Sequence, residues 1–360
     1  MVTDHAGPDH TPRGIRGPGF ADRLAAGPVI CAEGYLFELE RCGYLQAGAF
    51  VPEVVLEHPE QVTSLHEQFV HAGSDVVVAF TYYAHREKLR IIGRDGALEP
   101  MNRQALQIAG RVADQAGCLL AGNICNTNVY DPADPGSART VRAIFDEQVG
   151  WAADAGVDLV VAETFRYGGG ALIAQQVLGE AGLASVVTLA LGQEPTTREG
   201  WAVGEAGRRL AGAGAAVVGL NCLRGPATIL GPTGQIAAAV DVPVACLPAT
   251  YRTTPQQPTF QSLREDGPTA RPDGLSFPSG LDAFTTTRHE IAEFTRAAAE
   301  VGVRYFGLCC GAAPHHVRAL AEALGRTPPA SRYSEDMSKH AYFGSDPTLL
   351  ASNRAYAGRL

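Results

Sequence analysis

Three cysteines that directly follow two apolar segments are the residues whose types and spacing best support chemistry. Cys222 follows the run AAVVGLN, and Cys309 and Cys310 follow VRYFGL. Gly311 comes next, and glycine allows the backbone to turn so that both neighbouring sulfurs can point to one centre. Three thiolates suit Zn²⁺, and three protein ligands leave its fourth tetrahedral position open, as in catalytic sites. We therefore predict a catalytic Zn²⁺ site, with three buried cysteines packed under loops as the alternative.

Eight short apolar segments, which alternate with amphipathic helical patterns, must position these cysteines. Their continuous apolar character is typical of parallel strands that are buried on both faces. The alternation predicts an α/β fold, a single (β/α)8 TIM barrel, in which catalytic residues gather where the strands end. A doubly wound sheet is the alternative, but the chain has no GxGxxG fingerprint to favour it. The predicted strands are Pro28–Ala32, Asp75–Phe80, Cys118–Asn123, Val157–Glu163, Ser185–Ala190, Ala215–Asn221, Val242–Leu247 and Val303–Leu308.

Three regions depart from this alternation. Residues 1–17 are polar and rich in proline and glycine, which predicts a flexible leader before a barrel over residues 18–325. Residues 248–280 hold several prolines and form a long loop after the seventh strand, where loops cover the active face of a barrel. Residues 326–360 are too few for a domain, so we expect them to pack on the barrel or on a partner subunit. We expect a homo-oligomer, either a dimer or a tetramer.

Composition narrows the classes of partner. The chain has 360 residues and a formal net charge of −9, so it lacks the basic face that nucleic acids and anionic membranes require. It has no apolar run of about 18 residues, the length that spans a bilayer. Eight cysteines, two of them adjacent, suit reduced thiols better than disulfides, so we expect a cytoplasmic protein. The cysteines outside the trio are predicted to be buried structural thiols: Cys31, Cys42, Cys118, Cys125 and Cys246.

Several motifs resemble those of the homocysteine S-methyltransferase family. GLNC, which ends at Cys222, and GLCCG, which contains Cys309 and Cys310, are similar to its zinc motifs. ELERCGYLQAGAFVPE and AGSDVVVAFTYYAHREKL most resemble the betaine–homocysteine methyltransferase branch, and the similarity runs from about residue 20 to residue 330. The resemblance implies that a zinc-bound homocysteine thiolate attacks a methyl group on a small onium donor and yields methionine. Zinc would deprotonate the thiol, whose pKa is ordinarily near 8.5.

The resemblance also implies an aromatic pocket for the cationic methyl donor, since aromatic faces attract such cations. Tyr82 and Tyr83 follow the second strand in FTYYAH, and Phe50 stands where betaine enzymes usually carry tryptophan. We count Tyr83 among the catalytic residues. Asn123 and Asn126, after the third strand, are candidate polar groups on the donor side. The alternative is that the aromatic side chains only pack the top of the barrel.

For the acceptor, the resemblance implies carboxylates that bind the α-amino group. Glu163 ends the fourth strand in VVAETF and matches the family's amino-group ligand. The family's GDGGF is replaced by CAEGY, so its aspartate position falls on alanine, and Glu33 one residue later can restore the charge. Gly34 would allow close backbone approach to the substrate carboxylate. Two further candidates for polar contacts with substrate are Thr81 and Asn221.

Three alternatives remain open from the sequence. The donor can be of the betaine, S-methylmethionine or dimethylsulfoniopropionate type. The acceptor can be another thiol of specialised metabolism, because the site departs from the family pattern at CAEGY. A non-catalytic barrel that uses its adjacent cysteines for zinc binding or redox sensing is a different class of protein, but it leaves Glu163 and the aromatic cluster unexplained. We also expect the glycine run at residues 168–170 to be a loop that leaves room for substrate.

Overall fold

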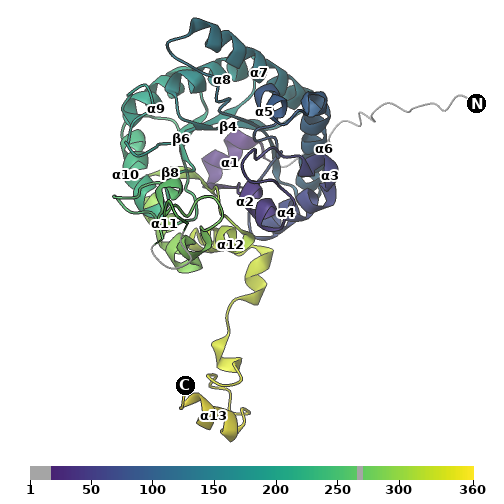
Figure 1. Ribbon diagram of the computed structural model, residues 1–360. Helices are drawn as coiled ribbons and strands as arrows, with labels where there is room; N and C mark the ends of the chain where they lie inside the picture. The colour runs from purple at the N-terminus through teal and green to yellow at the C-terminus, as the bar shows by residue number, and fades with distance from the viewer. Residues whose placement is uncertain (1–17, 266–270) are drawn as a thin grey trace, which may run out of the picture.

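A closed barrel of eight parallel strands forms the centre of this computed structural model, which describes residues 18–265 and 271–360 (Figure 1). The strands are β1 (Val29–Ala32), β2 (Val76–Val78), β3 (Leu119–Cys125), β4 (Leu159–Phe165), β5 (Ser185–Leu189), β6 (Val217–Asn221), β7 (Val244–Leu247) and β8 (Val303–Leu308). They pair in chain order, and β1 closes the ring against β8 from Val29↔Tyr305 to Ala32↔Leu308. This closure confirms the (β/α)8 barrel and excludes a doubly wound sheet, whose edges stay open.

The α-helices that the structure describes surround the strands, apart from α1 and the C-terminal α13 (Figure 1). They are α1 (Phe20–Ala26), α2 (Tyr35–Arg41), α3 (Val54–Glu57), α4 (Pro59–His71), α5 (Arg86–Ile91), α6 (Leu98–Ala116), α7 (Pro135–Asp154), α8 (Gly168–Glu180), α9 (Val203–Gly212), α10 (Pro226–Ala237), α11 (Arg288–Glu300), α12 (Pro314–Ala323) and α13 (Ala351–Ala357). Short 3-10 turns are η1 (Asp95–Ala97), η2 (Phe260–Ser262), η3 (Asp282–Phe284), η4 (Pro329–Tyr333) and η5 (Met337–Lys339).

Local sequence explains where representative helices begin. α4 starts at a proline and buries Val62, Leu65 and Phe69 on one face, the spacing of an amphipathic helix. α11 begins where the Thr287 side chain accepts a hydrogen bond from the Glu290 backbone N–H and the Glu290 carboxylate accepts one from Thr287. Such reciprocal caps satisfy backbone donors that a helix start leaves unpaired.

We predicted a loop for the glycine run at residues 168–170, and this prediction is wrong. These residues form the first turn of α8. Its function is close packing: a Cβ at Gly168 would lie 2.4 Å from the Trp201 ring, and one at Gly169 would lie 2.0 Å from the Tyr130 hydroxyl oxygen. The prediction about Cys42 is also wrong, because this thiol is exposed at the end of α2. The other four predicted structural thiols are buried: Cys31, Cys118, Cys125 and Cys246.

The two ends of the barrel are covered differently. α1 lies across the end where the strands begin, and its Phe20 ring packs edge-on against Tyr305 at 6.2 Å (Figure 1). At the opposite end, the long connection between β7 and α11 carries η2 and η3 over the cysteines. Its Tyr251, Phe260 and Leu263 join the cysteines in a second buried cluster. The predicted long loop after the seventh strand is therefore confirmed for its described residues; residues 266–270 lie outside them, as does the predicted leader at residues 1–17.

The C-terminal segment leaves the barrel after η4 and extends away from it to α13 (Figure 1). Large apolar side chains along it are exposed, among them Phe343 and Tyr356 at 58% and 50% of their surface. This segment therefore does not wrap its own barrel. Within the described part of the chain, no helix is both long enough and apolar enough to cross a bilayer.

Candidate active site

The three predicted cysteine ligands meet at the carboxyl ends of β6 and β8. Their sulfur atoms all lie within 4.8 Å of one another, and those of Cys222 and Cys310 are 3.3 Å apart. A tetrahedral zinc ion with Zn–S bonds of about 2.3 Å separates its sulfur ligands by about 3.8 Å. The trio therefore fits a single metal ion with small side-chain adjustments. Cys222 and Cys309 are buried and Cys310 is half-buried, so the site is shielded but reachable.

Unusual backbone conformations aim these sulfurs. Cys222 and Leu223 have φ values of 56° and 49°, in the left-handed region that residues other than glycine rarely adopt. Strain of this kind costs on the order of 1–3 kcal/mol per residue and is found at functional sites. Gly311 has φ 85°, and a Cβ there would lie 2.6 Å from the Tyr251 hydroxyl oxygen. The predicted turn after the cysteine pair is therefore confirmed.

The three cysteine thiols influence one another's pKa values through their close contacts. Hydrogen bonds from Cys309 and Cys310 hold the pKa of the Cys222 thiol well below its usual value. The same contacts with Cys222 raise the pKa of both neighbours. The lowered pKa favours the thiolate form of Cys222, which is the form that binds a metal, and a divalent metal would favour deprotonation of the other two.

Two buried carboxylates lie beside the sulfurs. Oxygen atoms of Glu33 and Glu163 and the sulfur of Cys309 all lie within 4.8 Å of one another. Burial raises the pKa of Glu163 to about 7, against a hydrogen bond from Asn123 that lowers it. Burial and the Glu163 carboxylate raise the pKa of Glu33 well above its usual value. A cation between the two carboxylates would relieve their repulsion, so the pair suits an ammonium group.

Among the described residues, two oxygen atoms in this place receive no hydrogen bond, namely Oε2 of Glu33 and Oδ1 of Asn123. Both residues line a small cavity of about 40 Å³ that Glu163 and the three cysteines also line. Buried acceptors without donors are costly. Their convergence on one cavity indicates a ligand that brings N–H groups.

A network behind Glu163 fixes its orientation. Asn123 and Asn221 each donate a side-chain hydrogen bond of 2.7 Å, one to each Glu163 oxygen. Asn221 also donates to the Thr164 hydroxyl, and its own oxygen accepts from the Thr164 backbone and the Thr188 hydroxyl, each at 2.9 Å. Both the nitrogen and the oxygen of the Asn221 side-chain amide therefore have hydrogen-bond partners within the protein. This arrangement favours a positioning role, while direct contact between Asn221 and substrate stays a prediction.

The remaining predicted site residues fall into two groups. Gly34 and Tyr82 line the metal cavity with the cysteines. Gly34 has φ 120°, and a Cβ there would meet backbone oxygens of Cys309 and Ala312 at 3.0 Å, so its close approach is to the metal-binding loop. Thr81, Tyr83 and Phe50 lie outside that cavity wall. Thr81 donates a 2.6 Å hydrogen bond to the Asn123 carbonyl.

The other two residues of the second group lie among aromatic rings. The Tyr83 ring lies 4.4 Å from that of Tyr82 and has the Lys88 ammonium 4.0 Å from its centroid. Phe50 packs against Phe37 with ring centroids 5.9 Å apart. Of the three aromatic residues that we predicted to line the donor pocket, only Tyr82 therefore borders the metal cavity. The donor-pocket roles of Tyr83 and Phe50 stay predictions.

The sequence analysis did not single out three residues that lie at the site or next to it. Thr164, at φ 62°, lines the metal cavity beside Glu163. Cys125 was interpreted as a purely structural thiol, yet its sulfur accepts a hydrogen bond from the Tyr83 backbone at 3.3 Å. Arg166 lies just past β4, in the same segment as Glu163. Its position directly after a strand that carries a predicted site residue was the available signal.

Comparisons with known proteins agree with this geometry. A family model described as homocysteine S-methyltransferase matches residues 33–324. The chain is 36% identical to betaine–homocysteine S-methyltransferase 1 of Xenopus laevis, over 91% of this chain and 80% of the relative. It is 34% identical to an S-methylmethionine–homocysteine S-methyltransferase of Rattus norvegicus, over 90% of this chain and 85% of the relative.

A solved structure supports the fold alone. The metallated form of the homocysteine methyltransferase MmuM from Escherichia coli superposes with a TM-score of 0.62 at 18% identity, covering 83% of this chain and 98% of that one. The family model spans most of the present chain, and the two relatives match over nearly all of it. This chain belongs to the homocysteine S-methyltransferase family and is a methyltransferase.

Proposed function

We propose that this chain is a zinc-dependent enzyme that transfers a methyl group from a small onium donor to homocysteine and forms methionine. The observation that carries the proposal is one cavity lined both by three converging sulfurs and by two unpaired buried acceptors, on Glu33 and Asn123. The sulfurs suit a metal that binds a thiol, and the acceptors suit the ammonium group of an amino acid. Homocysteine carries both groups.

The residues have distinct tasks in this reaction. Cys222, Cys309 and Cys310 would hold zinc, which keeps a bound thiol deprotonated at neutral pH. Glu33 and Glu163 would hold the acceptor's ammonium group and so orient its sulfur. The new bond joins that sulfur to the methyl carbon as the bond from the methyl carbon to nitrogen or sulfur of the donor breaks. The donor keeps that electron pair and leaves as a neutral amine or thioether.

Relatives of two kinds support an onium donor. The names of the two similar proteins give betaine and S-methylmethionine as their donors, and both compounds carry a cationic methyl-bearing centre. Tyr82 offers an aromatic wall to that centre at the edge of the metal cavity. Small-molecule substrates of this kind suit the cavity, and a cytoplasmic location suits its reduced thiols.

The experiment is a matrix of donors and thiol acceptors, with products identified by mass spectrometry. We expect methionine from homocysteine, and about one zinc ion per chain. Cys309→Ala should lose bound zinc and activity together, since two sulfurs hold the ion far less tightly. Cys246→Ala is the matched control and should keep both, because this buried thiol on β7 contacts Thr233 of α10 and does not line the metal cavity. Full zinc loading in Cys309→Ala would contradict the proposed site.

A further inference from the structure

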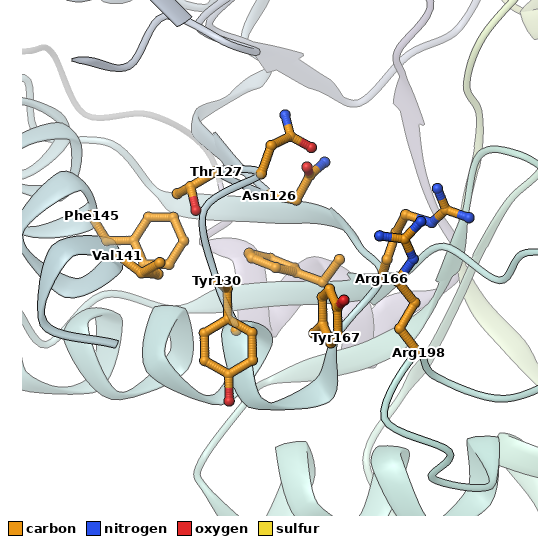
Figure 2. Close-up of a pocket in the computed structure, with 11 residues that line it drawn as sticks. Asn126, Thr127, Tyr130, Val141, Phe145, Arg166, Tyr167 and Arg198 are labelled. Atoms are coloured by element: carbon orange, nitrogen blue, oxygen red, sulfur yellow. The ribbon is translucent and has the colours of Figure 1, made fainter. Parts of the chain in front are cut away.

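A second cavity, of about 160 Å³, opens near the metal site at the carboxyl ends of β3 and β4 (Figure 2). Asn126 and Asn128 line it from the segment after β3, and Arg166 and Tyr167 from the segment after β4. Arg198 reaches it from the loop between β5 and α9. Figure 2 shows the two guanidinium groups close together on one side of the cavity. This cavity has no assigned role in the chemistry described above.

The two arginines have no acidic partner in the part of the chain that the structure describes. Among the described residues, neither guanidinium makes a hydrogen bond or an ion pair, and Arg198 only lies over the Tyr167 ring at 5.7 Å. The backbone N–H of Arg198 donates to the Arg166 carbonyl at 2.8 Å, which fixes the two residues side by side. Burial and the positive charge of Arg198 lower the pKa of Arg166. Arg166 is half-buried and Arg198 is exposed. Two like charges held side by side at the mouth of a cavity indicate a site for an anion.

Tyr83 connects this cavity to the metal site. Burial raises the pKa of the Tyr83 hydroxyl, and the nearby side chains of Asn128, Tyr82 and Asn126 partly offset that rise. The Tyr83 ring lies 4.4 Å from that of Tyr82, which borders the metal cavity. Arg166 also lines a groove with Leu223, the residue after the metal-binding Cys222. The arginine pair therefore lies next to the metal-binding segment and to the tyrosine pair at the edge of the metal cavity.

We propose that Arg166 and Arg198 form a subsite that binds the carboxylate of a zwitterionic methyl donor. The inference rests on the proposed function and specifies its donor class: an onium centre with a carboxylate on a short chain. The forked guanidinium groups match the two oxygens of a carboxylate. With that end held at the arginine pair, the cationic end lies toward Tyr82 and the metal cavity.

The acceptor does not need this subsite. Its ammonium and sulfur would both find partners in the metal cavity, where Glu33, Glu163 and the cysteines converge. Its carboxylate is attached to the same carbon as the ammonium group, so it would stay beside the two glutamates. The arginine cavity lies beyond the tyrosine pair from that place. Substitutions of the arginines should therefore change the kinetics of the donor and leave those of the thiol unchanged.

The test compares donors that differ only in the carboxylate, using the zinc-loaded full chain. Glycine betaine is paired with choline, and dimethylsulfoniopropionate with 3-hydroxypropyl dimethylsulfonium. For Arg166→Gln and Arg198→Gln, we expect kcat/KM for the carboxylate donors to fall roughly 10- to 100-fold, the usual effect of losing a hydrogen bond between charged groups. The kcat/KM values for the analogues that lack a carboxylate, KM for homocysteine and zinc content should stay unchanged. Arg111→Gln, an exposed position on α6, is the matched control.

Two outcomes would overturn the subsite. One is an equal loss for both members of each donor pair, and the other is a raised KM for homocysteine with donor kinetics unchanged. Calorimetric binding of glycine betaine and dimethylsulfoniopropionate separates this inference from the methyl-transfer proposal. Binding that disappears in Arg166→Gln, without turnover in any variant, would support the subsite and contradict the proposed reaction. Methyl transfer in which both variants still prefer the carboxylate donors would support the proposed reaction and contradict the subsite.

Discussion

Glu163 depends on Asn221 for the position of its carboxylate. The Asn221 amide donates to Oε2 of Glu163 at 2.7 Å and is held in turn by Thr164 and Thr188. A buried carboxylate that loses such a hydrogen bond becomes about 1.5–3 kcal/mol less stable as the charged form. The charged form is the one that would bind the acceptor's ammonium group, so Asn221 should act on the acceptor through Glu163.

We predict that Asn221→Ala lowers kcat/KM for homocysteine roughly 10- to 100-fold while zinc content stays unchanged. The loss should appear mainly as a raised KM for the thiol, and steady-state kinetics with metal analysis will measure both. Asn102→Ala is the matched control, because Asn102 is an equally buried asparagine that bonds to the Ala84 and Leu98 carbonyls, away from the metal cavity. Unchanged thiol kinetics in Asn221→Ala would contradict its positioning role.

His66 gives a prediction about stability and pH. Its ring is buried against Tyr35, with no hydrogen bond to either nitrogen from the described residues, and burial lowers its pKa to about 3. Unfolding returns the pKa to about 6.5, so the unfolded chain binds the proton more readily and stability falls as pH drops below that value. The loss from this one residue reaches about 2 kcal/mol at pH 5.

We therefore predict that His66→Phe loses less stability than the parent chain between pH 7.5 and pH 5. The change in melting temperature between the two pH values, measured by calorimetry, should be smaller by a few degrees. His71→Phe, exposed on the same helix, should behave as the parent does. A parent and a His66→Phe variant with equal pH dependence would show that the ring is already accessible to protons.

Which site residues could be predicted depended on their place along the chain. Cys222, Cys309 and Glu163 were found because each stands at or directly after the end of an apolar strand, and barrel topology brings those ends together. Arg166 and Arg198 were not found, because a charged residue in a loop is ordinarily solvated. Their significance is that they lack an acidic partner within residues 18–265 and 271–360, which only the three-dimensional neighbours reveal.

At the scale of elements, the connection from β7 to α11 holds the metal loops from above. Phe260 of η2 packs between Phe37 and Tyr251, with ring centroids at 5.8 and 5.6 Å, in the buried cluster that includes Cys222 and Cys309. Aromatic packing of this kind limits the freedom of both loops. The connection should therefore control how quickly the metal leaves.

We predict that Phe260→Ala lowers stability by about 3–5 kcal/mol and releases zinc to a chelator several times faster. Release can be followed with a colorimetric chelator at a temperature where the variant is folded. Phe294→Ala, a similarly buried ring on α11 that is absent from this cluster, should lower stability comparably without faster release. Equal release rates in the two variants would contradict a retaining role for η2.

Element boundaries follow the sequence closely wherever apolar runs define them. β8 occupies the predicted Val303–Leu308, while β3 and β4 each extend two residues further, because Cys125 and Phe165 stay paired with neighbouring strands. α8 was the exception, since glycine has weak helix propensity. Its first turn forms because bulky rings of Tyr130 and Trp201 fill the space that glycine side chains leave. Tertiary packing decided the helix start there.

At the scale of the whole molecule, the barrel is closed and self-sufficient, whereas the C-terminal segment is not. Phe343, Leu350 and Tyr356 are at least half exposed along a segment that extends away from the barrel (Figure 1). Exposed apolar side chains in a row are typical of interaction surfaces. A second copy of the chain is the partner we propose, because the segment does not return to its own barrel and most oligomers are homo-oligomers.

We predict that the chain is a dimer or tetramer in solution and that this segment holds the copies together. The triple variant Phe343→Ser, Leu350→Ser, Tyr356→Ser should therefore have a lower mass by sedimentation or light scattering, closer to the 37.9 kDa of one chain. Zinc content should stay unchanged, since these residues belong to the segment that extends away from the barrel to α13 (Figure 1). Lys339→Ser, an exposed polar change in the same segment, should keep the parent's mass. An unchanged mass in the triple variant would place the contact between copies on another surface, while a monomeric parent would contradict the assembly itself.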